Sequence, residues 1–334
     1  MRKIAIGVDW QGPLDLQATI GEARVADEAG VHLLSVAEAW GRDAFVILTA
    51  LAGATQGIHL GTSIVNIFSR TPAALAQAFI TLDTYFGHRM VIGMGSSGPQ
   101  VIEHFHGIKF ERPLQRMREY IEIISAISAA EPLHYHGKIF QLDRGFTMRD
   151  HQPPADRRHI PIHVASITPK SIEQTAQLAD GWIPIFVPRD QWNAQVAIAH
   201  DALLAVGRDV AQFDIRSGGS VTVTSDPDRA YGQIKENAAF YIARMGDFYY
   251  EHFLRIGLAD EANAVRAAWR DGGSKAGIEA VSDDLARSLG YAGPVEGCVE
   301  WIDAQQEAGY TIHGVTIEER DPAKRASIYR QLVG

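Results

Sequence analysis

The chain has 334 residues, of which 46% are hydrophobic and 21% charged, a composition typical of a globular protein with a substantial core. Its formal net charge of −9 argues against a surface for nucleic acid or anionic membrane. The single cysteine, Cys298, excludes an intramolecular disulfide and a thiolate-rich metal site. No apolar run reaches the ~18 residues of a membrane span, and the first residues lead directly into a strand. We therefore expect a cytoplasmic protein without a resident metal.

Short apolar segments typical of strands alternate with segments of helical periodicity along the whole chain. The first expected helix runs from Asp15 to Ala29 and ends at Gly30, where glycine suits a left-handed cap. Another opens at Thr71 and Pro72, a capping hydroxyl followed by a first-turn proline. In chain order, the expected strands are 3–8, 32–37, 58–65, 90–95, 160–165, 181–186, 215–223 and 312–317, and further helices are expected at 44–55, 114–129, 169–179 and 190–206.

The expected strands are rich in Val and Ile and do not alternate with polar residues. This pattern is typical of parallel strands that are buried on both faces. About eight β–α units fit a closed (β/α)8 barrel better than an open sheet. Two stretches interrupt the repeat: 131–150 reads as a small hairpin, and about 244–289 as a helical insertion. We therefore expect residues 1–334 to form one α/β domain, a TIM barrel with two insertions.

The glycines of the segment MVIGMGSSGPQ raise the question of a dinucleotide site. Gly93, Gly95 and Gly98 match the G-x-G-x-x-G pattern of a Rossmann NAD(P) dehydrogenase. That pattern belongs to the first β–α unit of its domain, whereas here three units precede it and Pro99 follows it directly. We therefore interpret it as a loop at the carboxyl end of a barrel strand, where barrel active sites lie. A tight loop without a ligand is the alternative.

Several longer segments occur in the order found in one known family. They are VAEAWGRDAF, GTSIVNIFSRTPAALAQ, GMGSSGPQVIEHFHG, RPLQRMREY, HVASITPKSIEQTAQLADGW and GDFYYEHFLRIGLADEANAV. Together they resemble the bacterial luciferase-like superfamily, and most closely its branch that uses coenzyme F420, a deazaflavin, including the methylene-tetrahydromethanopterin reductases. The resemblance covers nearly the whole chain. It implies a (β/α)8 barrel, usually oligomeric, with the (deaza)flavin at the carboxyl ends of the strands.

The resemblance also implies residues that contact the cofactor ring. The segment GTSIVN matches the end of the third barrel strand, where the family has a non-prolyl cis peptide, here between Ser63 and Ile64. Ile64 would then support the back of the deazaflavin ring, although a plain core position is its alternative role. Asn66 would lie at the polar edge of the ring. Glu38 matches an acidic position near the ring, and a carboxylate that caps the next turn is its alternative role.

Two further loops and one turn match cofactor contacts of the family. The start of the helix at 169–179 combines free N–H groups with the positive end of a helix dipole, which favours an anion. Lys170 there would contact the anionic tail of the cofactor or be a solvated surface charge. Gly181 belongs to the turn into the sixth strand, whose backbone would line the site. The loop residues are Gly95, Ser96 and Ser97 for the cofactor's side chain, and Ala165, Ser166 and Ile167 for its phosphate.

One position departs from the family pattern. Many deazaflavin members have a histidine directly after the acid at the end of the second strand, and here that position is Ala39. Histidine has the side chain best suited to proton transfer near neutral pH. Glu38 is then the predicted catalytic residue. Asp9, a histidine from elsewhere and the substrate's own acid–base chemistry are the alternatives.

An aromatic cluster lies in the second expected insertion. It consists of Phe248, Tyr249 and Tyr250. These side chains could line the mouth of a substrate pocket or form an oligomer interface. Core packing is the interpretation that we favour from the sequence.

The sequence thus predicts an enzyme, an F420-dependent oxidoreductase that transfers a hydride between the deazaflavin and a small organic substrate. The expected partners are that substrate, further copies of the chain in a homodimer or higher oligomer, and a flavin or F420 reductase that supplies reduced cofactor. If the cofactor is FMN instead, the protein is a luciferase-like monooxygenase that uses reduced flavin and oxygen. A non-catalytic (deaza)flavin-binding protein and, after it, an NAD(P) dehydrogenase are further alternatives.

Overall fold

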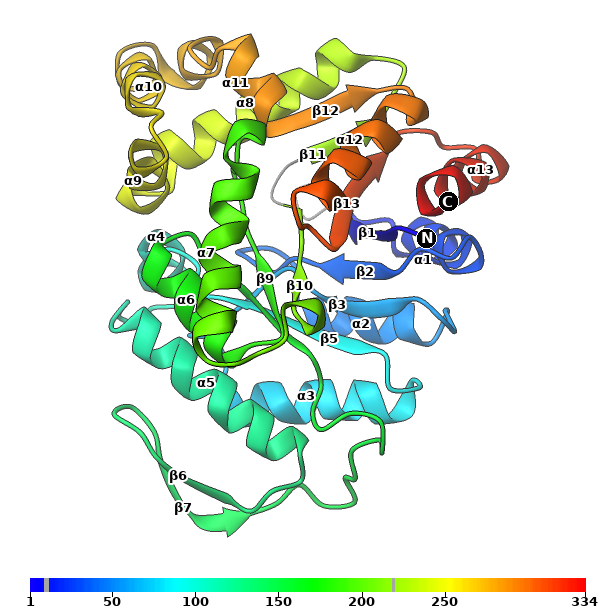
Figure 1. Ribbon diagram of the computed structural model, residues 1–334, viewed down its shortest axis with the longest axis vertical. Coiled ribbons are helices and arrows are strands. Elements are labelled where there is room, and N and C mark those ends of the chain that lie inside the picture. The colour runs from blue at the N-terminus through cyan, green and yellow to red at the C-terminus, as the bar shows by residue number, and fades with distance from the viewer. Residues whose placement is uncertain (9–11, 218–219) are drawn as a thin grey trace.

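The computed structural model describes residues 1–8, 12–217 and 220–334. Its centre is a curled sheet of parallel strands that is surrounded by helices (Figure 1). Among the described residues this sheet has 11 strands, in the order β10-β9-β8-β5-β3-β2-β1-β13-β11-β12, with β4 paired to β5. The strands are β1 Lys3–Val8, β2 Leu33–Val36, β3 His59–Thr62, β4 Val65–Asn66, β5 Met90–Gly95, β8 Ile162–Ala165, β9 Gly181–Ile183, β10 Asp214–Ile215, β11 Ser220–Val223, β12 Gly290–Gly293 and β13 Ile312–Ile317.

The sheet closes into a barrel between β10 and β13. β10 pairs with β9 on one side, and directly after β10 the residue Arg216 forms a parallel bridge with Ile312. Two backbone hydrogen bonds hold this seam: Ser217 donates to the Ile312 carbonyl at 2.7 Å, and Thr311 donates to the Ile215 carbonyl at 2.8 Å. Further along, β11 pairs with β13, and β12 pairs with the other side of β11. The predicted TIM-barrel architecture is confirmed.

Helices cover the outside of the barrel, and their starts follow local capping signals. Asp15 caps the first helix by accepting from the Ala18 N–H at 3.0 Å. Thr71 caps the third by accepting from the Ala74 N–H at 3.2 Å. Both starts agree with the sequence prediction. The helices around the barrel are α1 Leu16–Glu28, α2 Ala44–Ala52, α3 Pro72–Tyr85, α4 Pro99–His104, α5 Pro113–Ser128, α6 Pro169–Leu178, α7 Trp192–Ala205, α12 Val295–Glu307 and α13 Pro322–Val333.

Two segments depart from the β–α repeat. The first is an antiparallel hairpin of β6 (Leu133–His136) and β7 (Gln141–Phe146) at the place predicted for it. The second is helical and lies between β11 and β12. It begins earlier than the predicted residue 244, because a capped helix opens right after Asp226, which accepts from the Arg229 N–H at 3.2 Å. Its helices are α8 Pro227–Arg244, α9 Asp247–Arg255, α10 Ala259–Glu279 and α11 Asp283–Leu289, and they lie together at one end of the molecule (Figure 1).

The central strands are buried on both faces, as their apolar composition predicts. All residues of β2 and of β5 are buried. Each fully buried Val, Leu or Ile contributes about 1.5–3 kcal/mol relative to an exposed position. Cys298 lies in the same core, and burial raises the pKa of its thiol to about 12. Among the described residues, no helix combines the length and apolarity that crossing a membrane requires.

The glycines of β5 allow close approach between strands. A Cβ atom on Gly93 would lie 1.7 Å from the Thr62 carbonyl oxygen, so only glycine fits there. By contrast, a Cβ on Gly98, which precedes α4, would meet its nearest atom at 3.8 Å. The loop interpretation of this glycine segment is therefore supported, because its most restricted glycine lies inside a barrel strand.

These two glycines give a test of how the segment contributes to the protein. We expect Gly93→Ala to destabilise the fold by about 3 kcal/mol or more, because backbone atoms of β3 would have to move. Gly98→Ala is the matched control and should change the free energy of unfolding by less than about 1 kcal/mol. Urea unfolding of both variants provides the measurement. Equal stabilities would contradict the role of Gly93 in strand packing.

Candidate cofactor and substrate site

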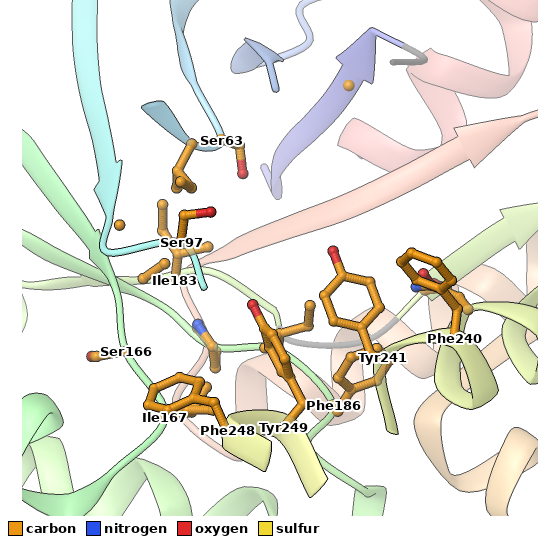
Figure 2. Close-up of a pocket in the computed structure, with 18 of the residues that line it drawn as sticks. Ser63, Ser97, Ser166, Ile167, Ile183, Phe186, Phe240, Tyr241, Phe248 and Tyr249 are labelled. Atoms are coloured by element: carbon orange, nitrogen blue, oxygen red, sulfur yellow. The ribbon is translucent and has the colours of Figure 1, made fainter. Parts of the chain in front are cut away.

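A large cavity opens at the carboxyl ends of the barrel strands. Its volume is about 1760 Å³, and residues that follow several barrel strands line it together with residues of α6, α8 and α9. Drug-sized ligands typically occupy ~300–1,000 Å³, so this cavity has room for a large cofactor and a second molecule. Figure 2 shows part of its lining. The predicted residues found in its wall are Ser63, Ile64, Gly95, Ser96, Ser97, Ala165, Ser166 and Ile167.

The wall next to β3 and β5 contains the predicted cis peptide. The peptide bond between Ser63 and Ile64 is cis, although the residue on its C-terminal side is isoleucine and not proline. This confirms the prediction from the GTSIVN segment. The side chain of Ile64 lies against Gly95, where an added Cβ atom would come within 3.0 Å of the Ile64 Cδ1 atom. Gly95 thereby leaves room for Ile64 at the end of β5. This packing forms an apolar surface at the rim of the barrel.

The loop after β5 continues this wall with two serines. Ser97 has a φ of 57°, the left-handed region that non-glycine residues seldom adopt. The Ser96 hydroxyl donates to the Ser97 carbonyl at 3.2 Å. The short loop therefore turns sharply between β5 and α4 while its small side chains leave the backbone close to the cavity.

The wall next to β8 leads to the N-terminus of α6. Ser166 is buried, and its hydroxyl shares a hydrogen bond with the Thr175 hydroxyl at 3.1 Å. The Ser166 carbonyl accepts from the Trp182 indole N–H at 2.8 Å. Thr168 caps α6 by accepting from the Ser171 N–H at 3.2 Å, and both residues line the cavity. The exposed Lys170 lines it as well, so this end of the cavity combines a cation with the positive end of a helix dipole.

Glu38 lies behind the cavity wall. It is not among the described residues that line the cavity. Its backbone N–H donates to the Ile64 carbonyl at 3.1 Å. Its carboxylate accepts from the Arg70 guanidinium at 2.5 and 3.0 Å and from the Ala44 N–H at 2.9 Å. Hydrogen bonding to Glu38 raises the pKa of Arg70. These contacts match the capping role that the sequence leaves open for Glu38.

Asn66 and Gly181 also lie outside the described cavity lining. Asn66 is buried, and its Oδ1 atom accepts from the Phe68 N–H at 2.9 Å and the Ser69 N–H at 2.7 Å. It thus stabilises the turn after β4. A Cβ atom on Gly181 would lie 2.7 Å from the Asp214 carbonyl oxygen, so this glycine allows β9 and β10 to approach. Direct cofactor contacts of Glu38, Asn66 and Gly181 stay predictions, and Asp9 lies outside the described residues.

An aromatic wall lies across the cavity from Ser63 (Figure 2), and sequence reasoning missed most of it. Tyr249 and Phe248, which the sequence singled out, belong to this wall, whereas Tyr250 does not line the cavity. The remaining members could not be identified from the sequence because they come from the β9 end and from α8. The aromatic side chains are Phe186, Phe240, Tyr241, Phe248 and Tyr249.

The wall contains two tyrosines, Tyr241 and Tyr249, whose phenol groups line the cavity. Their rings meet edge to face with centroids 4.6 Å apart. Figure 2 shows both hydroxyl ends turned toward the side where Ser63 lies. Burial raises the pKa of Tyr241, and burial together with Tyr241 raises the pKa of Tyr249. Both phenols are therefore protonated at neutral pH and can donate hydrogen bonds.

No histidine lines the cavity in the described part of the chain. The titratable side chains in the lining are Lys170, Glu236, Tyr241, Tyr249 and Glu318. Glu318 accepts from the Thr224 hydroxyl and pairs with Arg229. The cavity therefore offers an apolar surface, a lysine at the N-terminus of α6, neutral phenols and two carboxylates, of which Glu318 is paired with Arg229.

Comparison with known proteins identifies the family. The sequence model described as luciferase-like monooxygenase matches residues 4–311. A Mycobacterium tuberculosis protein, assigned by its name to the coenzyme F420-dependent oxidoreductases, is 31% identical over 94% of each chain. The 5,10-methylenetetrahydromethanopterin reductase of Archaeoglobus fulgidus is also 31% identical, over 93% of this chain and 92% of its own.

A solved structure agrees with this assignment at the level of the fold. The coenzyme F420-dependent tetrahydromethanopterin reductase of Methanopyrus kandleri superposes with a TM-score of 0.81, over 99% of this chain and 98% of its own, at 21% identity. The predicted resemblance is confirmed. Because the family model spans most of the chain and both relatives align along nearly its whole length, the protein belongs to the luciferase-like monooxygenase family.

Proposed function

We propose that the protein is a coenzyme F420-dependent oxidoreductase that transfers a hydride between the deazaflavin and a small organic substrate. The observation that carries this proposal is that Ile64, the loop after β5 and the start of α6 meet in one cavity. These are the segments that the family resemblance assigned to the ring, the side chain and the phosphate of the cofactor. Two relatives of the chain carry names that state F420 dependence or a related reductase activity.

The residues of the cavity fit such a cofactor. Ile64 and Gly95 supply an apolar surface on which a flat ring can pack, and a side chain on Gly95 would close this surface. The N-terminus of α6 and Lys170 supply positive potential for an anionic tail. When bound, a deazaflavin accepts or donates a hydride at the carbon that replaces the flavin N5 atom. The protein supplies binding, orientation and electrostatics for that chemistry.

The aromatic wall is the part of the site that we assign to the substrate. Phe186, Tyr241 and Tyr249 pack edge to face with one another. Beside a bound cofactor they would exclude water, which protects a hydride transfer from competing reactions. Tyr241 and Tyr249 would hold a substrate oxygen by hydrogen bonds from their hydroxyl groups. One of them would donate the proton when a carbonyl is reduced, the role that Ala39 leaves unfilled.

The second candidate function is an FMN-dependent monooxygenase. The description of the matching family model favours it, since that description names a monooxygenase. A flavin with nitrogen at position 5 activates oxygen, whereas a deazaflavin does so poorly, and therefore the identity of the cofactor decides the reaction class. A non-catalytic deazaflavin-binding protein would share the cavity but not the turnover.

We also propose that the protein works as a homodimer or higher oligomer and receives reduced cofactor from a separate flavin or F420 reductase. Both proposals rest on the family resemblance. A separate reductase is required whenever the protein only consumes reduced cofactor.

The first prediction concerns the identity of the cofactor. Coenzyme F420 should bind at least tenfold more tightly than FMN, a difference of ~1.4 kcal/mol that a few contacts can supply. Fluorescence titration of the purified protein with F420, FMN and NADPH in parallel gives the three dissociation constants. Comparable or tighter binding of FMN would favour the monooxygenase, and tight binding of NADPH alone would favour a dehydrogenase of another kind.

The second prediction concerns proton donation. The wild-type protein should oxidise reduced F420 in the presence of at least one small ketone or aldehyde. Replacing both phenols, in a Tyr241→Phe and Tyr249→Phe double variant, should lower kcat by about 10²-fold or more while the Kd for F420 stays unchanged.

Tyr250→Phe is the matched control, because the Tyr250 hydroxyl donates to the Asn263 side chain at 2.7 Å outside the cavity lining. Its kcat should equal that of the wild type. If the double variant keeps the wild-type kcat, neither tyrosine is the proton donor. Tight F420 binding without turnover on any acceptor would support the non-catalytic alternative.

The third prediction separates two roles for Glu38. We infer that Glu38 positions Arg70 and the start of α2, because its side chain is only 8% exposed and its carboxylate accepts from the Arg70 guanidinium and the Ala44 N–H. Glu38→Gln should therefore lower the free energy of unfolding by about 1–3 kcal/mol, the contribution of hydrogen bonds to a charged group.

Asp43→Asn serves as the control for Glu38→Gln. Asp43 also pairs with Arg70, but its side chain is 45% exposed, and asparagine keeps the ability to cap α2. Its effect on thermal unfolding should be below about 1 kcal/mol. A Glu38→Gln variant with unchanged stability but strongly reduced turnover would instead identify Glu38 as the catalytic residue.

A further inference from the structure

A second cavity lies inside the barrel, next to the large one. Its volume is about 230 Å³, and it is lined by residues of β1, β2, β9, β11 and β13. It adjoins the large cavity, because residues such as Ser63, Ile183 and Thr316 line both. A water molecule takes about 30 Å³ of liquid volume, so this space corresponds to roughly eight waters. It can hold a small organic molecule.

The lining of this inner cavity includes one buried cation, Arg216. The residue is 5% exposed. A guanidinium group has five N–H donors, yet within the described part of the chain only Nε has an acceptor, the Nδ1 atom of His163 at 3.1 Å. The Nη2 atom is buried and has no hydrogen-bond partner. No carboxylate among the described residues forms an ion pair with Arg216. Buried polar groups are normally satisfied, so this donor set indicates a missing acceptor.

The neighbours of Arg216 do not supply that acceptor. His163 is buried, and burial together with Arg216 lowers its pKa to about 3, so it is neutral. Asp214 is the acid whose charge raises the pKa of Arg216. Its Oδ1 atom accepts from Lys3 at 2.9 Å and from the Thr311 hydroxyl at 2.8 Å, and its Oδ2 atom lies 3.9 Å from the Nε2 atom of His163. Lys3 and Asp214 form an ion pair whose charges cancel, and His163 is neutral. The positive charge of Arg216 is therefore left without a counter-charge in this cluster.

Hydroxyl groups complete the lining. Ser35, Ser63, Ser217, Ser220 and Thr316 all border the inner cavity. Ser217 accepts from the Gly314 N–H at 3.0 Å, which leaves its own O–H free to donate. A planar guanidinium with unused donors matches the two oxygens of a carboxylate, and nearby hydroxyl groups add further donors.

We propose that Arg216 binds the carboxylate group of a small organic acid inside the barrel. The acid reaches this place through the large cavity, with which the inner cavity shares its lining. Burial lowers the pKa of Arg216 to about 10, which leaves the guanidinium charged at neutral pH. The proposal does not depend on F420 as the cofactor, since the site consists of this chain's own side chains and can be tested without a cofactor.

Acetate is the probe for the test, and acetamide is its neutral counterpart. With the cofactor-free protein, isothermal titration calorimetry should detect acetate but not acetamide at neutral pH. The thermal midpoint should rise with acetate concentration, as expected when a ligand binds only the folded state. Arg216→Gln should weaken acetate binding at least tenfold. Lys170→Gln, which removes a cation from the large cavity only, should leave acetate binding unchanged.

Three results would overturn the proposal. Equal effects of acetate and acetamide would mean that the guanidinium selects no anion. Unchanged acetate binding by folded Arg216→Gln, or its loss in Lys170→Gln, would place the anion elsewhere. If Arg216→Gln does not fold, a crystal structure of the wild type grown in acetate decides: a planar carboxylate on Arg216 supports the proposal, and ordered water alone at that position contradicts it.

Discussion

The seam between β10 and β13 is the constraint on which the site depends. Strands that are buried on both faces need hydrogen-bond partners on both edges, and the Arg216–Ile312 bridge supplies the last pairing of the ring. Because the strands are parallel, closure brings all their carboxyl ends to one rim. Ile64, Ser97 and Ile167 are far apart in the chain, yet they line the same cavity for this reason.

The barrel contains a charge that is paired with an opposite charge and another that is not. Glu38 and Arg70 neutralise each other next to the rim, and a backbone N–H completes the carboxylate's hydrogen bonds. Such a pair stabilises local structure and leaves little capacity for chemistry. Arg216 is buried, and among the described residues only its Nε atom has an acceptor. Since an unpaired buried charge costs stability, this contrast separates a structural charge from one available to a ligand.

The helices between β11 and β12 provide most of the aromatic wall of the site. A TIM barrel supplies a rim, and its insertions determine which molecules fit beside that rim. Here α8 and α9 bring Tyr241 and Tyr249 to the side of the cavity opposite Ser63 (Figure 2). Hydride transfer requires the donor and acceptor carbons to meet in a space with little water. Under the proposed function, the aromatic wall and its two neutral phenols would meet this requirement for a substrate that carries a carbonyl or hydroxyl group.

Local sequence determined most of the strands, the capped helix starts such as Asp15 and Thr71, and the hairpin, because these depend on residues close in the chain. It did not indicate β12 at Gly290–Gly293. Family resemblance extended this to the cis bond at Ser63–Ile64, which local propensity alone would not indicate. Only the tertiary structure placed Glu38 behind the wall, since its partner Arg70 is distant in sequence. The same holds for Tyr241 and for Arg216, whose roles depend on contacts between distant parts of the chain. These contacts place Tyr241 beside an open cavity and give the guanidinium of Arg216 fewer acceptors than it has donors.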